Sequence, residues 1–79
     1  MRIDKYLKVT RLIKRRTIAN EACDAGKILV NGVVIKASYD VKLDDVIQIN
    51  MGTKSLKVKV VSINEYSKKD DAADNYIVI

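Results

Sequence analysis

Near the start of the chain, hydrophobic residues recur at intervals of three and four, which is the spacing of an amphipathic helix. Ile3, Tyr6 and Leu7 follow this spacing with basic residues between them. We therefore expect a first helix over residues 4–9. Asp4 stands at its beginning, where a carboxylate interacts favourably with the positive end of the helix.

A second helix is predicted over residues 17–25. Thr17 is a suitable N-cap residue, and Gly26 can take the positive φ at which many helices end. Between the two helices, residues 11–16 are expected to form a loop or a ragged helix end that is held to the core by its apolar side chains. The positions of the second helix expected to face inward are Ile18, Ala19, Ala22 and Cys23.

Beyond Gly26 the hydrophobic period changes to two, which is typical of strands. The apolar runs 27–30 and 33–36 flank Asn31-Gly32, and Asn-Gly between two such runs is a strong signal for a tight hairpin. Polar turns are predicted at 42–45 and 51–54. Further strands are expected over residues 46–49, 56–61 with Ile63 continuing the pattern, and 76–79.

These elements predict an α+β fold in which two N-terminal helices pack on a small, mostly antiparallel sheet. The chain has 79 residues, of which 48% are hydrophobic. This is enough for one small core, so we expect a single domain over residues 1–79. Its C-terminal part, residues 51–79, would supply the last strands and a polar loop at 67–75.

The composition narrows the possible chemistry. The chain has no His and one Cys, so catalysis by His and a zinc site built from several thiolates are excluded. The carboxylate pairs Asp44-Asp45 and Asp70-Asp71 are expected to lie solvated in a turn and in a tail, because nothing nearby in sequence would bury them. We therefore expect no enzyme activity, no cofactor and no metal, and Cys23 is expected in the core.

No apolar run approaches the roughly 18 residues needed to span a bilayer. The first residues contain basic groups without a following apolar stretch, which is unlike a secretory signal. We expect a cytoplasmic protein without a membrane partner.

The distribution of charge is uneven. The formal net charge is +5, and seven of the fifteen basic residues stand in the first sixteen positions against a single acid, Asp4. The remainder of the chain is close to neutral. Such a one-sided concentration attracts polyanions, although a basic face that only keeps a protein in solution, or meets an acidic protein partner, remains an alternative.

The basic segment suits folded RNA. A-form RNA is recognised mainly by its shape, through phosphates and 2′-hydroxyls, and Arg can hold a phosphate with two hydrogen bonds. Asp4 is expected to orient Arg2 or to cap the helix rather than to touch RNA, and Asn31-Gly32 to form a turn first and an RNA contact second. The candidate RNA-binding residues are Arg2, Lys5, Lys8, Arg11, Lys14, Arg15, Arg16, Asn31 and Gly32.

Taken together, several motifs resemble one known family. In chain order they are Arg2-Ile3-Asp4-Lys5-Tyr6-Leu7, Arg11, Lys14-Arg15-Arg16-Thr17, Ala19, Gly26 with Ile28, and Val30-Asn31-Gly32. This set is similar to the S-four RNA-binding domain, named after protein four of the small ribosomal subunit, and spans about residues 1–50. The resemblance implies a helix pair, the alpha-L RNA-binding motif, packed on a small sheet.

Over its full length the chain also resembles a subgroup of small, stand-alone family members that act in bacterial ribosome quality control and are related to heat-shock protein fifteen. This resemblance implies binding to ribosomal RNA of the large subunit and to peptidyl-tRNA after a stalled ribosome has split. It also implies support for alanine tailing by an RqcH-type factor. A heat-shock-type recycling factor, or a module for another structured RNA, remains open. We expect a monomer.

Overall fold

The structure is a computed structural model, and it describes residues 1–63 and 75–79. Two helices precede five strands, which confirms the predicted α+β fold. The polar loop expected at 67–75 lies outside the described residues apart from Asn75. The elements are α1 (Ile3–Val9), α2 (Arg16–Asp24), β1 (Ile28–Val30), β2 (Val33–Val34), β3 (Val46–Met51), β4 (Lys54–Val60) and β5 (Tyr76–Val78).

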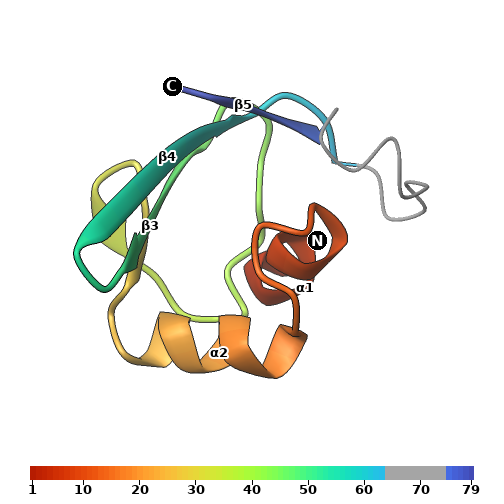
Figure 1. Cartoon of the computed structure of the whole chain (residues 1–79). Coiled ribbons are helices and arrows are strands. Elements are labelled where there is room, and N and C mark those ends of the chain that lie inside the picture. The colour runs from red at the N-terminus through yellow and green to blue at the C-terminus, as the bar shows by residue number, and fades with distance from the viewer. Residues whose placement is uncertain (64–74) are drawn as a thin grey trace.

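The strands form one sheet in the order β2-β1-β3-β4-β5 (Figure 1), and each of these neighbouring pairs is antiparallel. The predicted Asn-Gly hairpin joins β1 to β2, with Val30 opposite Val33. Asn31 and Gly32 have φ values of 52° and 81°, which are the positive values that this kind of tight turn requires.

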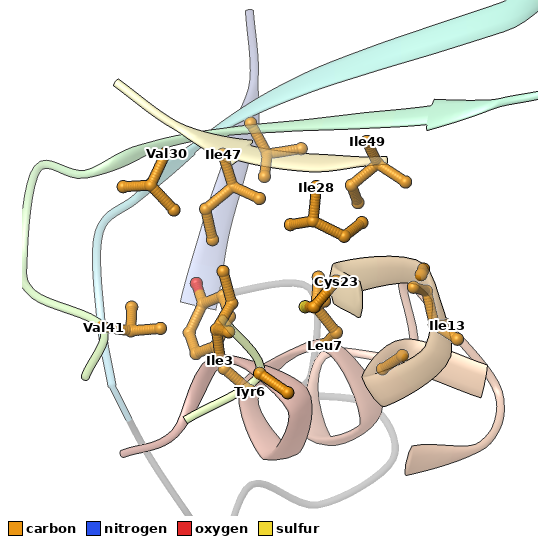
Figure 2. Packing of buried hydrophobic residues seen from close by; sticks show 14 of the residues in the cluster. Ile3, Tyr6, Leu7, Ile13, Cys23, Ile28, Val30, Val41, Ile47 and Ile49 are labelled. Atoms are coloured by element: carbon orange, nitrogen blue, oxygen red, sulfur yellow. The ribbon is translucent and has the colours of Figure 1, made fainter. Parts of the chain in front are cut away.

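The core lies between the helix pair and one face of the sheet. Figure 2 shows Ile28 and Ile47 of the sheet pointing toward Ile3 and Leu7 of α1, and all four side chains are fully buried. Tyr6 is also buried, and its hydroxyl donates a 2.7 Å hydrogen bond to the carbonyl oxygen of Asn75. The residue that leads into the last strand is thereby fixed to the first helix.

Two details of the second helix differ from the sequence prediction. It begins at Arg16, and Arg15 occupies the N-cap position without a side-chain cap, so the prediction of Thr17 as the cap is wrong. Ile18 was expected to face inward but is 41% exposed. Ala19 and Ala22, three residues apart, set the buried stripe of α2, and Ile18 lies beside that stripe.

The turn before β3 also differs from the prediction. Asp44 is exposed as expected, whereas Asp45 is only 7% exposed. Its Oδ2 accepts hydrogen bonds from the Tyr39 hydroxyl at 2.8 Å and the Lys42 backbone N–H at 2.9 Å, and its Oδ1 accepts one from the Asn31 side chain at 3.2 Å. We call this group of four residues the Asp45 turn. The second carboxylate pair, Asp70-Asp71, lies outside the described residues.

The strand predicted over residues 56–61 runs instead from Lys54 to Val60, and Ile63 is not part of it. Across the described ranges, no helix is both long enough and apolar enough to cross a membrane.

Candidate RNA-binding surface

The central feature of the candidate site is the carboxylate of Asp4, in the first turn of α1, which is 1% exposed. Its Oδ1 accepts a 2.8 Å hydrogen bond from the Lys5 backbone N–H. Its Oδ2 lies 3.2 Å from Arg2 Nη2, 3.4 Å from Arg16 Nε and 3.4 Å from Asn20 Nδ2. We call Arg2, Asp4, Arg16 and Asn20 the Asp4 clamp.

The local fold explains how residues so distant in sequence meet. Arg11 has a φ of 62°, a left-handed conformation that reverses the chain after α1. Ile13 is buried, and its N–H donates to the Leu7 carbonyl at 3.1 Å, which holds the connecting segment against α1. Arg16, the first residue of α2, therefore lies close to the start of α1, with its Nε 3.4 Å from Asp4 Oδ2.

Helix geometry then adds the last member of the clamp. Asn20 follows Arg16 by four residues, and side chains at this spacing lie on the same face of a helix. A buried carboxylate is thus surrounded by two cations and two neutral N–H donors from both helices.

The protonation of Asp4 reflects these partners. Burial by itself acts to raise the pKa of this carboxyl, but the Arg16 guanidinium, the Lys5 N–H and the Asn20 amide outweigh it and lower the pKa below its ordinary value of 3.8. Asp4 therefore stays charged at neutral pH and keeps both arginines in place.

The arginines of the clamp still face solvent. The side chains of Arg2 and Arg16 are 49% and 45% exposed, and a guanidinium has five N–H donors, of which the carboxylate uses few. Beside them is an open hollow of about 420 Å³, and Arg16 is the first residue of α2, where backbone N–H groups also favour anions. The residues lining the hollow are Arg2, Asp4, Arg16, Thr17, Asn20 and Glu21.

The nine predicted RNA-binding residues do not all lie at this hollow. The clamp brings Arg2 and Arg16 together, and Lys5, three residues after Arg2 on α1, is half-buried. Four other predicted cations are exposed on α1 and on the segment that leads into α2, but they do not line the hollow. These four are Lys8, Arg11, Lys14 and Arg15.

The hairpin turn is a separate feature. Asn31 is exposed, but its Nδ2 donates to Asp45 and its Oδ1 accepts the Val46 N–H at 3.0 Å. Both ends of the Asn31 side-chain amide thus make a hydrogen bond within the fold, and the Asn31 backbone N–H donates to the Val46 carbonyl at 2.8 Å. An RNA contact by Asn31 or Gly32 stays a prediction.

Sequence reasoning missed Thr17, Asn20 and Glu21 as lining residues. The available signal was the four-residue spacing from Arg16 to Asn20, which becomes useful only once the helix is known to start at Arg16. Among residues 1–63 and 75–79, no group of three or more Cys, Asp and Glu side chains is placed to hold a metal ion. Cys23 is buried, and burial raises the pKa of its thiol to about 11, with the charges of Asp4 and Asp24 adding to the shift.

A helix pair on an antiparallel sheet, with arginines gathered at the start of both helices, defines an RNA-binding module of the S4 type. The S4 domain family matches residues 1–47, which is more than half of the chain, and the chain belongs to this family.

Some relatives match the chain over its whole length and give a more specific comparison than the family does. The chain is 52% identical to the RQC P-site tRNA stabilizing factor of Streptococcus pneumoniae, over 100% of this chain and 90% of that protein. It is 47% identical to the factor of the same name from Bacillus subtilis, over 100% and 92%. Among solved structures, the trimeric structure of Vibrio cholerae heat shock protein 15 matches with a TM-score of 0.91 at 25% identity, over 100% of this chain and 81% of that one.

Proposed function

We propose that this protein is an RNA-binding accessory factor of bacterial ribosome-associated quality control. In this proposal it binds the large ribosomal subunit after stalling, contacts ribosomal RNA and peptidyl-tRNA, and supports alanine tailing by an RqcH-type factor. It acts by binding and positioning, without catalysis. Translation takes place in the bacterial cytoplasm, so the proposal includes that location.

The observation that carries the proposal is the Asp4 clamp. A buried carboxylate fixes Arg2 and Arg16 next to each other while about half of each side chain remains exposed. Pre-positioned arginines lose less conformational entropy when they bind a phosphate than mobile ones do. Such a surface suits a rigid, folded RNA better than a flexible acidic peptide.

The choice among RNA targets is supported by the relatives. The names of the Streptococcus and Bacillus proteins describe a factor that stabilises P-site tRNA in RQC, and identities near one half over the whole chain support the same role here. Each phosphate neutralised on duplex nucleic acid contributes about 0.9 to the salt slope of binding, so we expect affinity to fall steeply as salt rises.

A second candidate is a recycling factor of the heat-shock type. The match in fold to Vibrio cholerae heat shock protein 15 favours it. The solved structure of that protein is described as trimeric. For this chain we propose that the active form is a monomer.

The test uses large subunits that carry peptidyl-tRNA after splitting. The wild-type protein should co-sediment with them, and its omission from a reconstituted reaction should reduce RqcH-dependent alanine addition. The double variant Arg2→Ala/Arg16→Ala should lose both activities. The control is Lys57→Ala, which should behave as wild type. Lys57 is an exposed cation on β4, paired with Gln48 of β3.

Two outcomes would overturn the proposal. Protein that stays away from large subunits even at low salt contradicts RNA binding as the function. Tail addition that is unchanged by omitting the protein, together with faster recovery of free subunits when it is present, would favour the recycling role instead.

A further inference from the structure

We propose that the hollow beside the Asp4 clamp binds a single unpaired RNA nucleotide and favours guanine. The inference rests on the proposed function and names the ligand class of the same site. In this arrangement Arg2 and Arg16 hold the phosphate, and Glu21, which also lines the hollow, meets the edge of the base.

The shape of the site suits a nucleotide. A phosphate contact on a duplex needs only a protruding cation, whereas this site has an open hollow of about 420 Å³. That volume lies within the range of about 300–1,000 Å³ that is usual for small-ligand sites. Sequence-specific RNA recognition by proteins mostly uses unstacked bases from loops and bulges, which can enter such a space.

The lining of the hollow carries charges of both signs. Glu21 is exposed on α2 and lines the hollow together with Arg2 and Arg16. A carboxylate repels phosphate, so a site that served only the RNA backbone would be weakened by it. A carboxylate does accept hydrogen bonds from the amino groups of bases.

A hydrogen bond fixes the direction of the Asn20 side-chain amide. Its Nδ2 donates to Asp4 Oδ2 at 3.4 Å, which leaves Oδ1 as the acceptor end of the amide. When the two arginines hold the phosphate, the acceptors left for a base are the Glu21 carboxylate and Asn20 Oδ1, and the Thr17 hydroxyl can act either way.

A carboxylate selects bases by the N–H donors that they present. The Watson–Crick edge of guanine presents two adjacent donors, N1–H and N2–H, that fit one carboxylate. Adenine and cytosine each present one amino group, and uracil presents a single N–H between two carbonyl oxygens. One good bidentate pair discriminates by about tenfold, so we expect guanine to bind about tenfold more tightly than uracil.

The experiment measures fluorescence anisotropy with RNA hairpins that carry one bulged nucleotide, at a fixed salt concentration. The bulge is guanine, adenine, cytosine, uracil or an abasic ribose, and a fully paired hairpin is included. The guanine bulge should bind best, and the abasic and uracil bulges should bind about as weakly as the paired hairpin.

Two variants separate base recognition from bulk charge. Glu21→Gln should bind the hairpins without a guanine bulge somewhat more tightly, because an acid is lost from a basic surface. The guanine bulge also loses its carboxylate contact, so the preference for guanine over uracil should fall to less than threefold. Asp24→Asn removes the same charge one turn along the helix, at an exposed residue that does not line the hollow. It should keep the tenfold preference.

The outcomes distinguish the two proposals. Equal binding of all hairpins overturns the nucleotide site and leaves general RNA binding intact. A guanine preference that survives Glu21→Gln shows that the Glu21 carboxylate does not recognise the base, and this overturns the proposed site. Absence of binding to any of the RNAs, and to large subunits, overturns the proposed function and this inference together.

Discussion

Asp4 and Asp45 are both nearly buried carboxylates, yet the regions around them differ in what the carboxylate holds. The Asp4 clamp binds two arginines whose remaining N–H groups face solvent. The Asp45 turn binds a hydroxyl, an amide and a backbone N–H, all of them neutral and all of them used within the fold.

From this difference we expect Asp4 mainly to position the arginines for RNA and Asp45 mainly to stabilise the fold. Removing Asp45 leaves part-buried neutral donors without an acceptor, which costs mainly folding free energy. Removing Asp4 releases arginines that are already half exposed and can be solvated by water, so the loss falls mainly on the geometry offered to RNA. The four predictions that follow would break or sharpen this contrast.

The largest effect is expected for Asp45→Ala. Loss of the acceptor for Asn31, Tyr39 and the Lys42 N–H should lower the free energy of unfolding by about 3 kcal/mol, since three hydrogen bonds are lost and each is worth about 1 kcal/mol. Urea denaturation measures this change. RNA affinity of the folded protein should remain within about threefold of wild type, because the Asp4 clamp is untouched.

The matched control is Asp44→Asn at the neighbouring residue. Asp44 is exposed and has a φ of 70°, which Asn also tolerates, and its 3.7 Å ion pair with Lys59 lies at the surface. We expect a change below about 0.5 kcal/mol. Equal destabilisation by the two variants would show that the Asp45 turn has no special role.

The next effect is expected for Arg16→Ala. A hydrogen bond to a charged group is worth about 1.5–3 kcal/mol, so RNA affinity should fall by about 30-fold while the unfolding free energy changes by less than about 1 kcal/mol. Its control is Arg15→Ala, which removes the same charge from the adjacent exposed residue outside the clamp. Anisotropy titrations should give a loss of about threefold for Arg15→Ala; equal losses would contradict the importance of the clamp.

A smaller effect is expected for Asp4→Asn. The direction of the change in RNA affinity distinguishes positioning of the arginines from bulk electrostatics. The variant makes the protein more positive, so bulk electrostatics alone would increase RNA affinity. Loss of the charge that fixes Arg2 and Arg16 should instead reduce the affinity about fivefold, with a stability loss of about 1 kcal/mol. Asp24→Asn, with the same change in net charge, should bind RNA as well as wild type or better. Tighter binding by Asp4→Asn would refute the positioning role.

Part of the fold and of the candidate site could be predicted from the sequence. The first helix, the Asn31-Gly32 hairpin and the excess of cations near the start follow from local spacing and composition, and the structure confirms the helix and the hairpin. Asp4 was expected to orient Arg2, and it does so at 3.2 Å.

What escaped prediction depends on contacts between distant residues. Asp45 accepts hydrogen bonds from the nearby Tyr39 and Lys42, but also from Asn31, fourteen positions earlier, and no local pattern reveals this last contact. The pairing of Asp4 with Arg16 depends likewise on how residues 11–15 reverse the chain. The start of α2 was misplaced because Thr17 is a good capping residue in general, whereas Arg15 is the N-cap here.

The smallest expected effect is on the pH dependence of stability. The pKa of Asp4 is lowered in the folded protein from an ordinary value of 3.8, so the unfolded chain binds a proton more readily than the folded one. The stabilisation from the Asp4 charge is therefore complete above about pH 5 and is lost as the pH falls toward and below 3.8. Urea unfolding of wild type and Asp4→Asn at pH 7, 5, 4 and 3 should show a difference of about 1 kcal/mol at neutral pH that shrinks on acidification. A difference that stays constant, or grows, would mean that Asp4 is not held as a charged group by its arginines, and the contrast with Asp45 would lose its electrostatic basis.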